Sequence, residues 1–194
     1  MASRTAAPGE GSSGGASGEL IIHRIPPIVD DDSRVLVLGT MPSPKSREVS
    51  FYYGNPQNRF WRVLAALWDE PVPGMGADGR LLDDVDAVNE ARRELCHRRH
   101  VALWDVLASC RIAGASDASI SKPVANDVAG LLDGSRIARV ITTGSTATRL
   151  YRRLVEPVCG VGCTGLPSTS PANASWSLPR LVEAYAPLRE AADS

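Results

Sequence analysis

The stretch VLVLG at residues 35–39 is an unbroken apolar run that stops at a glycine. Such a run, rich in β-branched residues, is typical of a strand buried on both faces. Similar runs follow at 101–107 (VALWDVL) and 139–144 (RVITTG), and a shorter one lies around 163–166. Amphipathic helical patterns separate these runs. The alternation predicts an α/β protein, a three-layer α/β/α sandwich around a mostly parallel four-stranded sheet.

The helices are predicted from apolar residues that recur at spacings of three and four. In the first of them Phe60 and Trp61 fall on the apolar face, so both are expected in the core. The five predicted helices cover residues 58–67, 85–99, 125–132, 146–155, and 178–185 or a little beyond. Ligands of such sheets bind where the strands end at their carboxyl side. The chemistry is therefore expected in loop 40–57, after Trp104, and in loop 168–173.

Length and composition predict one folded domain. Of 194 residues, 43% are hydrophobic and 22% charged, which suits a single globular core. Residues 1–18 are mostly Gly, Ser and Ala, so we predict a disordered tail followed by a catalytic domain at 19–194. The net charge of −1 gives no overall attraction to nucleic acid, so any basic surface must be local.

Two basic groups stand out. Residues Lys45, Arg47, Arg59 and Arg62 surround the first loop and form a candidate surface for phosphates. The second group, within 92–100, ends a predicted helix, where the helix dipole favours positive charge.

The four cysteines do not have the spacing of a metal or iron–sulfur site. The only close pair is Cys159 and Cys163, in CGVGC, so we interpret all four as structural thiols. With no secretory signal and no run as long as a membrane span, the chain is expected to be a cytoplasmic monomer.

Three blocks of sequence carry a resemblance to a known family. The blocks GTMPSPKSREVSFYYGNPQNRFWRVL (39–64), VALWDVLASC (101–110) and LPSTSPAN (166–173) together resemble the hypoxanthine-DNA glycosylases of the uracil-DNA glycosylase superfamily. The resemblance implies a uracil-DNA glycosylase-like fold, no metal and no cofactor. Its implied substrate is DNA containing a deaminated base, which base excision repair would remove.

The resemblance is incomplete at a few positions. NPQNRFW also resembles the HPANRFW of mismatch-specific uracil glycosylases, with Asn55 in place of the histidine. Thr143 and Ser145 stand where relatives often have Asn and Lys, and this difference could remove a DNA contact.

The first block also implies where catalysis occurs. In GTMPS, Gly39 and Met41 are substrate-binding candidates, but Met41 replaces the relatives' aspartate or asparagine and cannot activate water. The resemblance therefore assigns catalysis to Asn58, whose amide oxygen can orient a water toward the sugar. The alternative role for Asn58 is to cap the helix that it begins.

Two further residues are candidates for holding the base. Tyr53, in the sequence FYY at 51–53, could stack on an extruded base, although these aromatics could equally pack in the core. Asp105 ends a predicted strand and could accept the N1–H that hypoxanthine has and adenine lacks. The alternatives for Asp105 are a protonated group or a purely structural carboxylate.

The LPSTSPAN loop resembles the superfamily's second motif. Ser168 stands at a base-contacting position and Ser170 at a phosphate-binding position, while Asn173 either enters the DNA groove or caps the turn. A simple turn built from Ser, Pro and Asn explains the same composition. His23, His97 and His100 lack the spacing of ligands, and we assign them no chemistry.

Other functions remain open at this point. The alternatives are a uracil- or mismatch-directed glycosylase and a catalytically silent DNA- or nucleotide-binding relative. A serine hydrolase is disfavoured because no GxSxG motif is present. The only lysines, Lys45 and Lys122, give no sign of an amine nucleophile, so we predict a monofunctional glycosylase without lyase activity.

Overall fold

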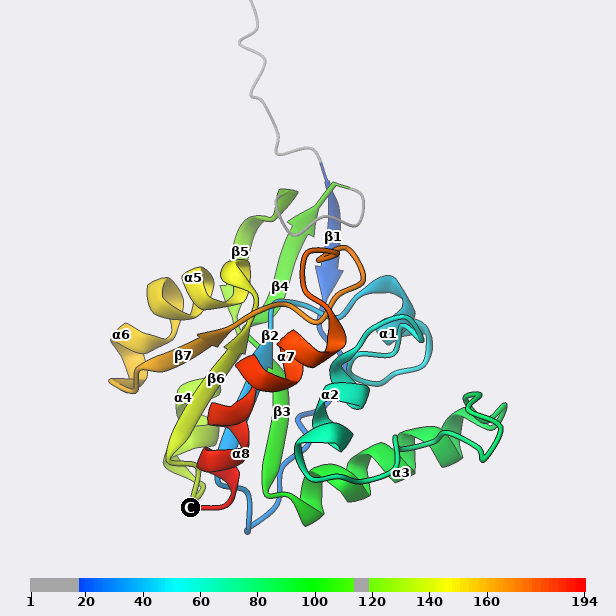
Figure 1. Cartoon of the computed structure of the whole chain (residues 1–194). Helices are drawn as coiled ribbons and strands as arrows, with labels where there is room; N and C mark the ends of the chain where they lie inside the picture. The colour runs from blue at the N-terminus through cyan, green and yellow to red at the C-terminus, as the bar shows by residue number, and fades with distance from the viewer. Residues whose placement is uncertain (1–17, 114–118) are drawn as a thin grey trace, which may run out of the picture.

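The central layer is a four-stranded, fully parallel sheet. A computed structural model describes residues 18–113 and 119–194. The sheet has the order β3 (Val101–Asp105), β2 (Val35–Gly39), β6 (Arg139–Thr143), β7 (Cys163–Leu166), as Figure 1 shows. All five residues of β2 are buried, as expected of a central strand. The α/β prediction and its four strands are confirmed.

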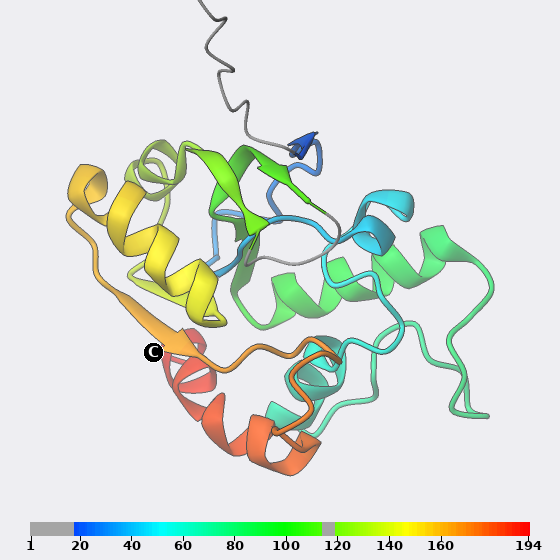
Figure 2. The same cartoon turned by 90° about the horizontal axis from the view of Figure 1, so that it is seen from above.

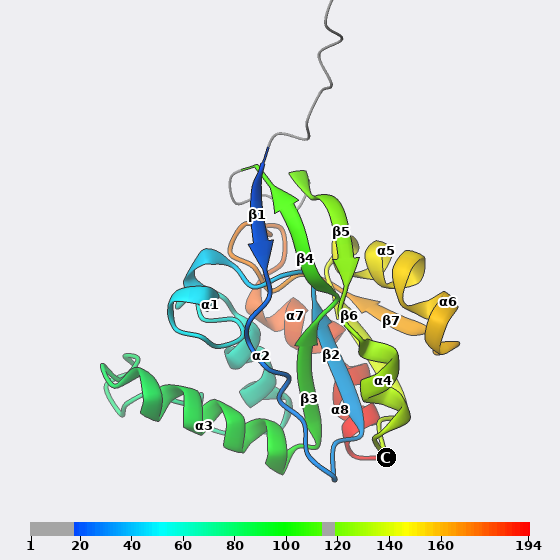
Figure 3. The ribbon, with the colours of Figure 1, turned by 180° about the vertical axis from the view of Figure 1, so that it is seen from behind.

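Helices cover both faces of this sheet, so the molecule has three layers when seen from above (Figure 2). Odd-numbered residues of β2, such as Val37, face one side, and even-numbered ones, such as Leu38, face the other. The first side packs against α2 (Phe60–Leu67), α3 (Val85–Arg98), α7 (Leu178–Ala184) and α8 (Ala186–Ala192). The second side packs against α4 (Val128–Asp133), α5 (Ser145–Leu154) and α6 (Glu156–Cys159), seen from behind in Figure 3.

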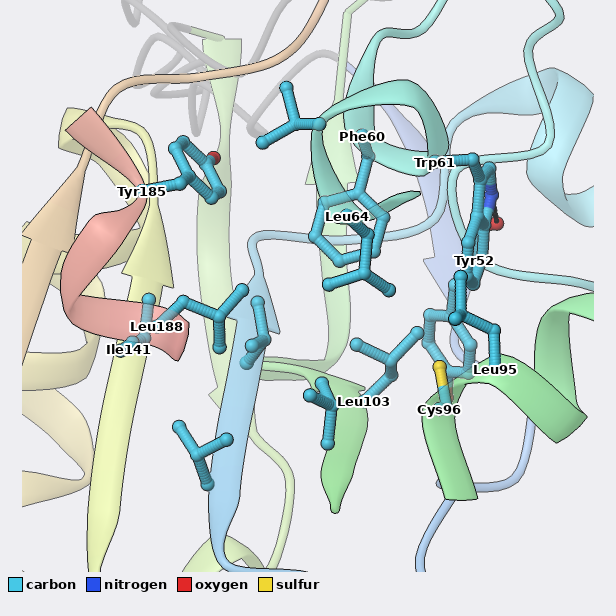
Figure 4. Close-up of a cluster of buried hydrophobic side chains, with 14 of the residues drawn as sticks. Tyr52, Phe60, Trp61, Leu64, Leu95, Cys96, Leu103, Ile141, Tyr185 and Leu188 are labelled. Atoms are coloured by element: carbon cyan, nitrogen blue, oxygen red, sulfur yellow. Dashed lines mark hydrogen bonds between the residues drawn. The ribbon is translucent and has the colours of Figure 1, made fainter. Parts of the chain in front are cut away.

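The larger core lies on the side of α2 and α3. Figure 4 shows Phe60, Trp61 and Leu64 of α2 in this cluster. Phe60 has 0% of its surface exposed and Trp61 has 3%, so both belong to the core, as predicted. Burying aromatic side chains of this size contributes about 1.5 to 3 kcal/mol each. This packing fixes α2, and with it the loop that leads into the helix.

A second, antiparallel sheet was not predicted. It has the order β1 (Glu19–Ile22), β4 (Leu107–Ile112), β5 (Ser121–Ala125) and lies beyond the carboxyl ends of the parallel strands (Figure 1). The predicted strand 101–107 is in fact two strands, because β3 ends at Asp105 and Leu107 begins β4, which pairs with β1 in the other sheet. β5 contains Pro123, which a strand at the edge of a sheet tolerates.

Two short helices also escaped prediction, α1 (Pro44–Glu48) and α6. Ser43 caps α1 by accepting from the Ser46 N–H. The predicted tail, residues 1–18, lies outside the described residues except for Gly18. No helix in the described part of the chain is long and apolar enough to cross a membrane.

Candidate active site

A cleft of about 800 Å³ lies at the carboxyl ends of β2, β3 and β6. Strand ends, the loop after β2 and the loop after β7 form its walls. The cleft brings together all eight residues that the sequence singled out, namely Gly39, Met41, Tyr53, Asn58, Asp105, Ser168, Ser170 and Asn173. The predicted loops therefore meet in one cleft, and the contacts of the individual side chains bear on their roles.

Gly39 and Asp105 lie side by side at the floor of the cleft. They are register partners in the β2–β3 ladder. A Cβ on residue 39 would overlap the Asp105 Oδ1 atom, so glycine is required for the carboxylate to lie against the strand. Asp105 is only 5% exposed, yet it lines the cleft. Its Oδ1 atom is thus the oxygen turned toward Gly39.

The other oxygen of Asp105 contacts His23, a residue for which the sequence analysis predicted no chemistry. Oδ2 lies 2.9 Å from the Nε2 atom of His23, which follows β1 directly. The side chain of Asp105 is 8% exposed and that of His23 is 2% exposed. The backbone N–H of His23 donates to the Ala108 carbonyl, which anchors the histidine beside β4. Because 82 residues separate the pair, nothing in the sequence could have linked them.

Tyr53 presents an aromatic ring to the cleft. One face of the ring stacks on Phe60, with centroids 3.8 Å apart and planes 14° apart, so only the opposite face is available to a base. Its hydroxyl lies 3.1 Å from Thr143 Oγ1, and Thr143 donates to the Leu38 carbonyl. Burial raises the pKa of Tyr53 well above its usual value, so its hydroxyl stays protonated.

Asn58 lies just before α2, next to its N-cap residue Arg59, and uses its amide oxygen twice. Oδ1 accepts from the Phe60 N–H at 2.9 Å and from the Thr169 hydroxyl at 2.8 Å. Asn58 is therefore not the N-cap residue, but its side chain does satisfy the N–H of the first residue of the helix. Because Phe60 N–H is a donor, the oxygen of the amide must be the atom facing it. Within the described residues, both hydrogen bonds of this side chain involve Oδ1, and Asn58 lines the cleft.

The loop of residues 167–173 is held by Arg59. Its guanidinium donates to the carbonyls of Thr169, Ser170, Asn173 and Trp176. The prediction that Arg59 belongs to a phosphate-binding surface is therefore wrong, because the side chain is occupied by four carbonyl oxygens of the protein. The sequence could not show this, since 110 residues separate Arg59 from Thr169.

Asn173 and Ser168 stabilise the same loop from within. Asn173 Nδ2 donates to the Ser168 carbonyl at 2.8 Å, so the turn-capping alternative is observed for this residue. The Ser168 hydroxyl accepts from the Ser170 N–H, and the Ser170 hydroxyl accepts from the Ala172 N–H. Gly144, at φ +94°, lets Ser168 approach the end of β6 closely. Both serines also line the cleft.

The remaining basic residues separate into two places. Arg47 is exposed and lines the cleft, while Lys45 pairs with Glu48 at 2.7 Å. Arg98 and Arg99 lie at the end of α3, just before β3 and so away from the cleft, and both pair with Glu70. His97 and Arg98 lie in the last turn of α3, where the helix dipole favours positive charge.

The cysteines lie in different parts of the fold. Cys96 is buried on the α3 side of the sheet and Cys110 on the α5 side. Cys159 lies 3.5 Å from the Tyr151 hydroxyl, and none of the four cysteines, all within the described residues, forms a disulfide. Over the described ranges, no three His, Cys, Asp or Glu side chains are grouped so as to hold a metal ion.

Comparison with known proteins decides the family. The family model described as "Uracil DNA glycosylase superfamily" matches residues 26–191. The chain belongs to the uracil-DNA glycosylase superfamily. Among its relatives in that superfamily is the hypoxanthine DNA glycosylase of Methanosarcina acetivorans, 30% identical over 164 residues, which are 84% of this chain and 96% of that protein.

Two further relatives agree. The hypoxanthine DNA glycosylase of Methanosarcina barkeri is 30% identical over 108 residues, 56% of this chain and 61% of the relative. An NMR structure of a Methanosarcina acetivorans protein, provisionally described as a uracil DNA glycosylase, superposes with a TM-score of 0.70 at 26% identity. It covers 91% of this chain and all of its own. The uracil-DNA glycosylase-like fold is thereby shown.

Proposed function

We propose that this protein is a monofunctional DNA glycosylase that hydrolyses the N-glycosidic bond of hypoxanthine in DNA, as a step of base excision repair. The observation that supports this best is the cleft in which Asn58, Tyr53 and Asp105 meet at the ends of the parallel strands. An extruded nucleotide needs a surface for its base, a group that reads the base edge and a group that positions water. One monomer supplies all three.

The reaction leaves a cationic sugar and an anionic base in its transition state, so even a weakly activated water can attack once the bond is largely broken. We assign the positioning of that water to Asn58 Nδ2, because Oδ1 already accepts two hydrogen bonds. The amide N–H donates to one lone pair of the water and leaves the other directed at the sugar carbon. Asn58 thus both accepts from the first N–H of α2 and orients the nucleophile.

Asp105 is proposed to read the base. Its carboxylate lines the cleft, with Oδ2 held 2.9 Å from His23 Nε2. The carboxylate accepts the N1–H of hypoxanthine, whereas adenine would oppose it with a lone pair. His23 donating to Asp105 also withdraws negative charge from the carboxylate, which reduces its repulsion of the departing anion.

Uracil is the second candidate substrate, and the same observation favours it. Uracil N3–H is a donor beside a carbonyl, as hypoxanthine N1–H is, so the Asp105 carboxylate can accept from either. Stacking separates the two bases, because a purine covers more of the free Tyr53 face than a pyrimidine does. We therefore place hypoxanthine first.

The test is single-turnover excision from end-labelled duplexes that each carry one inosine, uracil, xanthine or adenine, followed by alkaline cleavage. We expect inosine to be released at least about tenfold faster than uracil, which corresponds to about 1.4 kcal/mol. Faster release of uracil would transfer the proposal to the second candidate. No release of any base by a folded protein that binds the duplexes would identify a silent DNA-binding relative.

A further inference from the structure

A second hollow, of about 970 Å³, adjoins the cleft on the far side of the 167–173 loop. The two share Ser168 and Asn173, so they are continuous across the loop. The opposite wall of this hollow is α5, which begins at Ser145 directly after β6. A polymer that places one nucleotide in the cleft would therefore extend naturally along α5.

The wall formed by α5 is strongly basic. Arg149, Arg152 and Arg153 all line the hollow, all are exposed, and their spacing of three and four places them on one helix face. The opposite face of α5 is buried through Leu150 and Tyr151, so the arginines cannot turn inward. No carboxylate lines this hollow, and the ion pairs recorded between described residues do not include these three arginines.

The length of the basic face suits a nucleic-acid backbone. From Arg149 to Arg153 the helix rises by about 6 Å at 1.5 Å per residue. One DNA strand carries a phosphate about every 3.4 Å along the duplex axis, so the face spans about two phosphates. The positive end of the α5 dipole, at Ser145, lies nearest the cleft and adds to the attraction.

We propose that the α5 face, formed by Arg149, Arg152 and Arg153, binds the phosphates of the DNA strand that carries the extruded nucleotide. The inference rests on the proposed function, because it requires DNA in the cleft. It explains how a chain with a net charge of −1 binds a polyanion: the positive charge is concentrated where the strand leaves the active site. The 167–173 loop then sits between the extruded base and its flanking phosphates.

The experiment compares the double variant Arg152→Gln/Arg153→Gln with a matched control, Arg136→Gln/Arg139→Gln. Both remove two exposed arginines, but Arg136 and Arg139 lie at the amino end of β6, away from the cleft. Binding is measured on a duplex containing one abasic-site analogue, between about 50 and 200 mM salt. Circular dichroism melting curves establish that both variants are folded.

We expect the slope of log affinity against log salt to become shallower by about 1.8 in the Arg152/Arg153 variant, since each lost phosphate contact removes about 0.9. The control should keep the wild-type slope. Equal slopes for both variants would overturn the proposal. Since the probe contains no base to excise, the result is separable from the proposed function: a protein that excises nothing can still show the α5 effect, and an active glycosylase can lack it.

Discussion

Replacing Asn58 tests the centre of the proposed mechanism, and the structure sets the size of the effect. Asn58→Ala removes the acceptor of the Phe60 N–H, which costs about 0.5 to 2 kcal/mol, as much as a lost helix cap. It also leaves the hydroxyl of Thr169, a residue only 1% exposed, without this acceptor, at about 1 to 3 kcal/mol. The expected loss of stability is about 1.5 to 5 kcal/mol, or roughly 3 to 20 °C in melting temperature for a chain of this size.

The catalytic part of the effect is separate. Single-turnover release of hypoxanthine should fall about tenfold to a thousandfold in Asn58→Ala, measured below its melting temperature, while binding to inosine duplexes changes little. That pattern is expected when an interaction made only in the transition state is removed.

Asn58→Asp provides the matched control. It keeps an acceptor for Phe60 and Thr169, so its melting temperature should stay within a few degrees of wild type. The second carboxylate oxygen takes the place of Nδ2 and can accept a proton from water, so release should exceed that of Asn58→Ala by at least about tenfold at neutral pH. Wild-type release by a folded Asn58→Ala protein would refute the catalytic role and leave Asn58 with a structural role alone.

Three further predictions concern other residues. Asp105→Asn should weaken discrimination of inosine against adenine while inosine release falls little; an equal proportional loss on every base, with a lower melting temperature, would make Asp105 purely structural. His23→Ala should reduce the same discrimination and His23→Gln should largely restore it, because the glutamine amide can still donate to Asp105; no difference between the two variants in base ratios would remove His23 from base reading. Glu70→Gln should lower the free energy of unfolding by about 1 kcal/mol at neutral pH. Burial raises the pKa of Glu70, but Arg98 and Arg99 lower it by more, so the pKa in the folded protein lies below the usual 4.5. The ionised carboxylate therefore stabilises the fold above pH 4.5, and this stabilisation is lost as the pH falls through the lowered pKa. Melting curves of both proteins should therefore converge in acid, and a constant gap would contradict the assignment.

The parallel sheet could be predicted because each of its strands is a short apolar run that the local sequence shows. The run at 35–39 is buried on both faces, so every residue in it is apolar, and the pattern needs no tertiary information. β4 and β5 gave no such signal. Their ladder contains register shifts, and β5 has Pro123 and Lys122 within five residues. Pairing along β1 and β4, rather than residue type, makes these segments strands.

The site was predictable at the level of loops and less so at the level of contacts. The ends of parallel strands must meet at one edge, which is why the loops after β2 and β7 both reached the cleft. The contacts of Arg59 and Asn58 with Thr169 could not be predicted. Each side chain bonds this residue of loop 167–173 from more than 100 residues away, and side-chain contacts at that separation leave no pattern in a single sequence.

The unpredicted antiparallel sheet also explains how Asp105 is positioned. β3 ends at Asp105, and the chain continues through Val106 into β4, which pairs with β1. That pairing carries His23 back beneath the Asp105 carboxylate. A buried carboxylate without a partner is strongly disfavoured, so the position of Asp105 depends on a strand that begins at Glu19. If Asp105 reads the base as we propose, the small sheet takes part in recognition, because it supplies the histidine that holds the carboxylate at the cleft.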